Sequence, residues 1–275
     1  MEREQCLFKN QKFYLFFLFI YVLTLCNVLV AEVYNGATTS DMIEFDKDEI
    51  KFWLKKEKGM EITHFARIDQ IEITGVKNFD QTDLNIAYNQ SKNKIINNTC
   101  TIVACAEMIN YYGEYLNEFK IDDSATETFI NVYDRCMQAG YTTYINGTVK
   151  LNEGYCLTES FKLYSSKRGA ASDWWNLQAN IDKCVENKYP MILDLKNHSV
   201  VVCGRIRYGV VYLEKYWDGF LWWGSEKTRE KRVIEEFAIV CDGWGRQSKS
   251  VVYYPKITNF VSGSMQVTWA TKGDK

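Results

Sequence analysis

Three residue types that together can cleave an amide occur in one order along this chain. Cys100 follows a polar loop, Asn97-Asn98-Thr99, and begins an apolar run that predicts a buried helix. The free N–H groups and the positive dipole end of a helix N-terminus favour thiolate over thiol, and the thiolate is the nucleophile. His198 and Asp242 follow downstream. A cysteine nucleophile, a histidine proton carrier and an aspartate that orients the ring are together sufficient for acyl transfer.

Each of these residues has a rival in the sequence. Cys105 lies five residues further along the predicted helix, about 140° around its surface, and is interpreted as a core residue. Asp218 is nearer to His198 in sequence, but Asp242 directly follows an apolar strand and lies next to a tryptophan. We therefore prefer Asp242 as the orienting residue. The other histidine, His64, is interpreted as structural.

The elements expected to position these residues are helices first and short strands afterwards, which is an α+β order. Apolar residues at helical spacing predict helices over Asp46–Lys58, after a Ser124 cap and after a Ser172 cap. Asn146-Gly147 indicates a hairpin turn, and the charge run Glu226–Arg232 indicates a solvated loop. Strands are expected at Ile62–Thr74, Met191–Leu193, Ser199–Cys203, Val210–Leu213, Phe237–Cys241 and Ser250–Tyr254.

Composition narrows the classes of function. The 275 residues carry a formal charge of −2, which disfavours a nucleic-acid partner because phosphate binding needs a basic surface. Nine cysteines spread over a chain of this size do not form a disulfide scaffold. Seven of them follow residue 31, and this odd number is typical of a chain with one free, reactive thiol. With only two histidines and no Cys-x-x-Cys, neither a metal nor a cofactor is expected.

The N-terminal region predicts export. Phe13–Ala31 is almost continuously apolar and follows two lysines, as in a signal peptide cleaved after Ala31 or a retained membrane anchor. Either form places the remainder outside the cytoplasm, secreted or anchored to a membrane through this segment. We divide the chain into residues 1–31 as leader, 32–84 as an extension and 85–275 as the main domain. The extension is either an inhibitory propeptide or the edge of the fold.

Four parts of the chain carry a common pattern. They are Tyr88-Asn89-Gln90 with Cys100–Gly113, Cys184–Leu195, His198–Gly204, and Asp242-Gly243-Trp244-Gly245. Together they resemble the papain-like (clan CA) cysteine peptidases related to the bacteriocin-leader peptidase family, and more distantly streptopain, over roughly Tyr88 to Tyr254. The resemblance implies a papain-like fold in which a helical part packs on a twisted antiparallel sheet, and it implies that Gln90 is the oxyanion donor beside the Cys100 backbone N–H.

Three functions remain open from the sequence. The first is an exported cysteine peptidase that cleaves a peptide or protein substrate with Cys100, His198, Asp242 and Gln90. The second is an acyltransferase or transpeptidase, which uses the same thioester but a different acceptor. The third is a papain-like module that binds without catalysis.

Overall fold

The computed structural model describes residues 37–144, 146–165, 167–220, 223–245, 249–257 and 265–272. Residues 36–275 form one compact unit. The predicted leader Phe13–Ala31 and its cleavage point lie outside the described residues. Within the ranges given above, no helix combines the length and the apolar character that crossing a bilayer requires.

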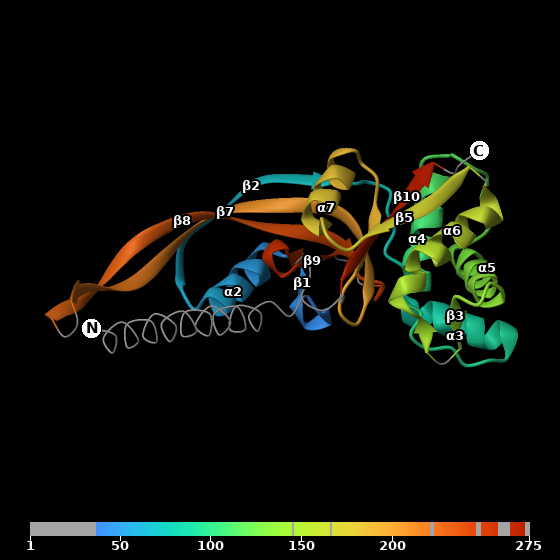
Figure 1. The fold of residues 1–275 in the computed structure, drawn as a ribbon, viewed down its shortest axis with the longest axis horizontal. Coiled ribbons are helices and arrows are strands. Elements are labelled where there is room, and N and C mark those ends of the chain that lie inside the picture. Colours follow the sequence, from blue (N-terminus) through green and yellow to red (C-terminus); the bar gives the residue numbers. More distant parts are fainter. Residues whose placement is uncertain are drawn as a thin grey trace, which may run out of the picture. The chain divides into compact units, whose positions relative to one another are not determined.

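The unit is a mixture of helices and an antiparallel sheet, so the α+β prediction is confirmed at this level (Figure 1). The sheet order is β1-β9-β8-β7-β6-β10-β5, and β2 pairs with β7. Its strands are β1 (Met42–Glu44), β2 (Glu61–Glu72), β5 (Arg168–Asp173), β6 (Met191–Asp194), β7 (Ser199–Phe220), β8 (Trp223–Cys241), β9 (Ser250–Tyr253) and β10 (Gln266–Lys272). β3 (Thr142–Thr143) and β4 (Gly147–Thr148) form a separate hairpin at the predicted Asn146-Gly147 turn.

Local sequence signals account for the starts of several helices. Asp46 accepts hydrogen bonds from the first-turn N–H groups of α2, and Gly59 ends that helix in the left-handed conformation. Ser124 and Glu127 form a capping box on α5. The cap predicted at Ser172 is wrong, because Ser172 lies in β5 and the helix begins after Asn176. The helices are α2 (Lys47–Lys58), α3 (Gln81–Lys92), α4 (Cys100–Asn110), α5 (Ala125–Gln138), α6 (Glu153–Tyr164) and α7 (Leu177–Glu186), with a π-helical turn at Tyr111–Tyr115 and 3-10 turns at Thr39–Asp41, Lys150–Asn152 and Tyr254–Lys256.

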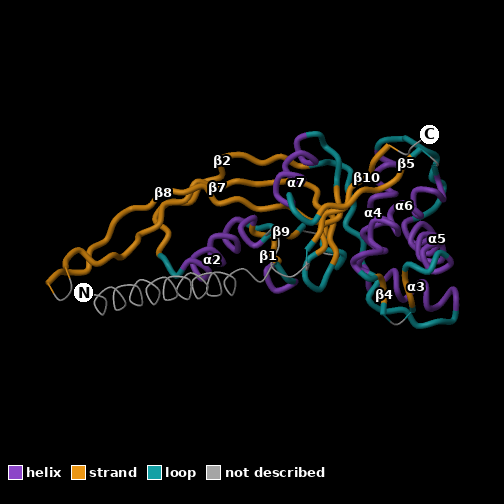
Figure 2. Tube along the Cα trace, viewed as in Figure 1, coloured by secondary structure: helices purple, strands orange, loops and turns teal. Residues whose placement is uncertain are grey.

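Alternation along the strands divides the interior into two cores, because successive strand side chains point to opposite faces. One face packs against α7 through alternate residues of the central strands. The other face packs against α2 and α4 and joins the core of α5 and α6. Figure 2 shows these helices on either side of the strands. The face toward α7 carries Met191, Leu193, Val200, Val202, Ala238 and Val240, and the opposite face carries Ile192, Val201, Cys203, Ile239 and Cys241.

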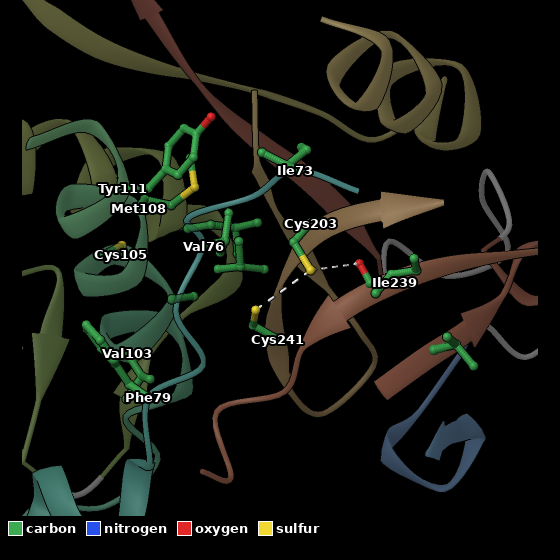
Figure 3. Close-up of a cluster of buried hydrophobic side chains, with 14 of the residues drawn as sticks. Ile73, Val76, Phe79, Val103, Cys105, Met108, Tyr111, Cys203, Ile239 and Cys241 are labelled. Atoms are coloured by element: carbon green, nitrogen blue, oxygen red, sulfur yellow. Dashed lines mark hydrogen bonds between the residues drawn. The ribbon is translucent and has the colours of Figure 1, made fainter. Parts of the chain in front are cut away.

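The segment before α3 is built into this core. β2 pairs with β7 from Ile62 to Glu72, and the chain then passes between α4 and the sheet. In Figure 3, Ile73, Val76 and Phe79 lie between the side chains of α4 and those of the central strands. The described part of the predicted extension therefore contributes side chains to the same core as α4 and the central strands.

The region between Val210 and Glu236 is a strand pair rather than a loop. β7 and β8 pair from Val201↔Cys241 to Phe220↔Trp223, with one register shift between Val202 and Gly204. The prediction of a solvated loop at Glu226–Arg232 is wrong, because these charged residues belong to β8. Their charges face partners on β7, which allows a charged sequence to form an exposed strand.

Candidate active site

Cys100 is the first residue of α4, as the sequence predicted. Thr99 accepts the first intrahelical bond, from the Val103 N–H at 2.9 Å, so the N–H groups of the first turn face the thiol end of the helix. Cys100 is partly exposed, whereas Cys105 is fully buried and burial raises its pKa well above the usual range. The two thiols therefore differ as expected: one at the helix terminus and one in the core.

The β3–β4 hairpin holds the loop that delivers Cys100. The Asn97 N–H donates to the Tyr144 carbonyl at 3.1 Å. Gly147 has φ +66°, and a Cβ there would lie 2.1 Å from the Asn98 carbonyl oxygen. Only glycine fits this contact, so the hairpin tip is pressed directly against the loop two residues before the thiol.

His198 lies at the turn between β6 and β7 and is 6% exposed. Its Nε2 is 2.7 Å from the Asp242 carbonyl oxygen. A carbonyl can only accept, so Nε2 carries a proton and Nδ1 is the ring nitrogen left to act on the Cys100 thiol, whose pKa His198 lowers. The ring stacks on Trp244, with centroids 5.0 Å apart and planes at 15°. The ring is therefore fixed from two sides, by the Asp242 carbonyl and by Trp244, and it lies near enough to Cys100 for each group to shift the pKa of the other.

The electrostatics of this pair favour the charged form of both groups. Burial raises the pKa of the Cys100 thiol, but the hydrogen bond and charge of His198 and the Ser199 N–H outweigh it, and the pKa is lowered. Burial likewise lowers the pKa of His198, but Cys100 and the Asp242 carbonyl outweigh it, and the pKa is raised. A lowered thiol pKa beside a raised imidazole pKa is the pattern of a thiolate–imidazolium pair.

Asp242 contacts His198 in a different way from the one the sequence suggested. The hydrogen bond to the ring comes from the main-chain carbonyl, while the carboxylate adds a favourable charge through space. The fully buried carboxylate accepts from Asn78 Nδ2 at 3.1 Å, Trp244 N at 3.0 Å and Ser250 Oγ at 2.7 Å. Asp218 lies on β7 far along the strand pair, where it forms an ion pair with Lys227.

Asn78 secures this turn from the opposite side. Its Nδ2 donates to the Asp242 carboxylate, and its Oδ1 accepts from the Gly243 N–H at 2.9 Å. One amide thus spans the peptide whose carbonyl holds the His198 ring. The sequence analysis did not identify Asn78, because its partners are 164 and 165 residues away.

Among the described residues, no hydrogen bond joins the predicted oxyanion donor Gln90 to Cys100. Gln90 lies near the end of α3 with its side chain exposed. The glutamine that borders the site is Gln81, at the start of the same helix, whose N–H donates to the Gly243 carbonyl at 2.7 Å. One helical turn further, Asn85 accepts from the Thr99 hydroxyl at 2.7 Å, so this face of α3 meets the loop before Cys100.

The amide end of Gln81 is suited to donate into the site. Its Oε1 is buried and has no hydrogen-bond partner among the described residues. Rotation of the amide about its last torsion places the NH₂ there, where a developing oxyanion would satisfy it. One local sequence signal marks where this helix begins: Asp80 caps α3 and immediately precedes Gln81.

Two buried carboxyl groups, Asp194 and Glu153, interact electrostatically with the Cys100 thiol. Asp194 accepts from the Ser199 hydroxyl at 3.1 Å, and that hydroxyl is 2.9 Å from the Thr101 hydroxyl of α4. Glu153 is fully buried on α6 and accepts from Gln266 at 3.0 Å. Burial, and then the charge of Asp194, raise the pKa of Glu153 well above the usual range.

Comparison with known protein families, curated proteins and solved structures gave no match for this chain. In the described ranges, no group of three or more histidine, cysteine, aspartate or glutamate side chains is arranged to hold a metal ion. The geometry around Cys100 and His198 is therefore the basis for assigning a function.

Proposed function

We propose that the chain is a cysteine peptidase with a papain-like arrangement, acting on a peptide or protein substrate. The observation that carries the proposal is the pairing of Cys100, at a helix N-terminus, with a buried His198 whose other ring nitrogen is tied to a carbonyl. This is the geometry that an activated thiol nucleophile requires.

In this mechanism the Cys100 thiolate attacks the carbonyl carbon of the scissile amide. The carbonyl oxygen becomes an oxyanion, which accepts hydrogen bonds from the Cys100 backbone N–H and the Gln81 side chain. His198 then donates the Nδ1 proton to the departing amine, and the C–N bond breaks to leave a thioester. Water gives its proton to Nδ1 and attacks the thioester, which releases the acid and restores the thiolate and imidazolium.

The support for Asp242 is its position rather than a hydrogen bond that its carboxylate accepts from the ring. Its carbonyl holds Nε2–H, and its carboxylate stabilises the turn and the charge on His198. Secretion, or anchoring outside the cytoplasm through Phe13–Ala31, is part of the proposal because the apolar segment has the length for either.

The test is covalent labelling followed by turnover. A peptide vinyl sulfone should modify Cys100 in the wild type, with modification abolished in Cys100→Ala and at least tenfold slower in His198→Ala. Cys105→Ala is the matched control, because Cys105 lies in the same helix but in the core, and its labelling should be unchanged in folded protein. Labelling without release of a cleaved peptide, but with transfer to an added amine, would assign acyl transfer instead. An unreactive Cys100 in folded protein would exclude both enzymatic functions.

A further inference from the structure

The outer part of the β7–β8 pair has only two strands. β2 accompanies β7 as far as Glu61↔Leu213, and β9 accompanies β8 only over Phe237–Val240. Beyond Leu213, residues Glu214–Phe220 and Trp223–Arg229 pair with each other alone. We call this part the ribbon arm, and it runs past the end of β2 in Figure 1. A two-stranded ribbon is marginally stable in water unless side-chain pairs or a docking partner support it.

Charged residues of the ribbon arm are paired across its strands. Lys215 lies 2.7 Å from Glu226, and Arg229 lies 2.7 Å from Glu214. The Arg229 guanidinium also covers the Tyr216 ring, 5.2 Å from its centroid. Asp218 pairs with Lys227. These six charges sum to zero, three of each sign, so the arm carries no net charge with which to attract an oppositely charged partner.

The far end of the arm exposes large aromatic side chains. Trp217 is 56% exposed, Trp223 is 81% exposed and Tyr216 is 36% exposed. Taking about 250 Å² for a fully exposed aromatic side chain, these three offer roughly 400 Å². A stable protein–protein interface needs about 800 Å² from each partner, so these three described side chains alone are too small for one.

The two tryptophans lie on opposite faces of the arm. Directly paired residues share a face, and the register pairs Trp217 with Glu226 but Phe220 with Trp223. Residues 217 and 220 differ by an odd number, so the Trp217 and Trp223 side chains point away from each other. A protein partner that docks on one face would cover one tryptophan and leave the other in water. A medium that surrounds the tip covers both.

From these observations we propose that the tip of the ribbon arm, Tyr216, Trp217 and Trp223, inserts into the headgroup region of a lipid bilayer. Tryptophan and tyrosine settle in this region because they are apolar rings with a polar group. The internally paired charges of the arm then lie at the level of the hydrated headgroups. The inference is independent of the proposed peptidase activity, and it goes beyond the membrane contact predicted for Phe13–Ala31.

The neutrality of the arm makes the proposal specific. Binding through a basic patch would require anionic lipid and would weaken with salt. Insertion of aromatic side chains should instead occur on zwitterionic phosphatidylcholine vesicles and should persist at high salt.

Tryptophan fluorescence can report on the arm in the full chain. All eight tryptophans lie at or after Trp53, so the apolar leader contributes none of the signal even if it binds the same vesicles. Phosphatidylcholine brominated near the headgroup should quench part of the wild-type emission. The quenched emission should fall by at least half in Trp217→Ser/Trp223→Ser. Trp175→Ser is the matched control, because Trp175 is 58% exposed on another element, and its quenched emission should be unchanged.

Several results would overturn the proposal. These are an absence of quenching in the wild type, equal quenching in the double variant, or quenching abolished by high salt. Self-association of the wild type that the double variant loses would assign the tip to a second copy of the chain. Each single variant, checked for folding by circular dichroism, should lose part of the quenching, because the two side chains insert from opposite faces.

Discussion

Replacement of Asp242 separates two ways in which this residue can act on His198. The sequence alone leads to the expectation that Asp242→Ala slows turnover while the thermal midpoint hardly moves. The structure changes that expectation, because the carboxylate is fully buried and accepts three hydrogen bonds. The contact with the ring is made by the main-chain carbonyl, which every substitution retains.

Asp242→Ala should lower the free energy of unfolding because it leaves three buried hydrogen-bond donors without their acceptor. A hydrogen bond to a charged group contributes about 1.5–3 kcal/mol, and neighbouring losses are not additive. Removing one partner from a buried charged network costs about 3–5 kcal/mol in total. For a unit of this size each kcal/mol lowers the midpoint by about 2–4 °C, so Asp242→Ala should lower it by about 10 °C.

Asp242→Asn is the informative variant for activity. It retains the shape, one accepting oxygen and the carbonyl that holds Nε2, but removes the charge. We expect kcat to fall by no more than about tenfold, with a midpoint a few degrees lower. Where a carboxylate itself holds the ring, the same change costs about 10⁴ in kcat because the ring loses its correct tautomer.

The assay is kcat on a labelled peptide, measured beside calorimetric midpoints for wild type, Asp242→Asn and Asp242→Ala. Asp218→Asn is the control, since that carboxylate lies on the ribbon arm and should affect neither quantity. A fall of several thousandfold in kcat for Asp242→Asn at an unchanged midpoint would refute our reasoning. It would return the orienting role to the carboxylate.

Four further predictions concern the neighbourhood of the thiol. Gln81→Ala should lower kcat by about 10²–10³, the effect of losing one oxyanion donor, while the exposed Gln90→Ala should leave it unchanged; equal effects in steady-state kinetics would withdraw the assignment. The profile of kcat/KM against pH should be bell-shaped. Its acid limb should lie below the ordinary thiol pKa, where Cys100 deprotonates, and its alkaline limb above the ordinary imidazole pKa, where His198 loses its proton. In His198→Ala, the pH at which iodoacetamide alkylates Cys100 should move upward, and an unmoved profile would contradict the pair. Glu153 has a raised pKa in the fold, so its contribution to stability is fully present below its ordinary value of 4.5 and is lost as pH rises toward the folded value. Glu153→Gln should therefore gain stability relative to wild type by about 1.4 kcal/mol per pH unit above that value, seen in urea unfolding at several pH values, and a constant difference would show that Glu153 is ionised in the fold.

The sequence was most informative where chemistry and local structure coincide. Cys100 was identifiable because a polar loop before an apolar helix is a local pattern, and His198 because a polar residue precedes an apolar strand. Asn78 and Gln81 were missed since their roles depend on contacts with the Asp242–Gly243 peptide, more than 160 residues away. The ribbon arm was mistaken for a loop because its alternating charges are satisfied across the strands, which periodicity in one segment cannot reveal.

Long-range closure of the site has a consequence for biosynthesis. The contacts that fix His198 and its turn join residues 78, 198, 242 and 250, so the last of them leaves the ribosome after most of the chain. Thr101 likewise meets Ser199 across a separation of 98 residues. A nascent chain holding only the Cys100 helix thus contains a thiol without its imidazole. Under the proposed function, the site is complete only once residue 250 has been synthesised, so a shorter nascent chain cannot cleave the machinery that makes it.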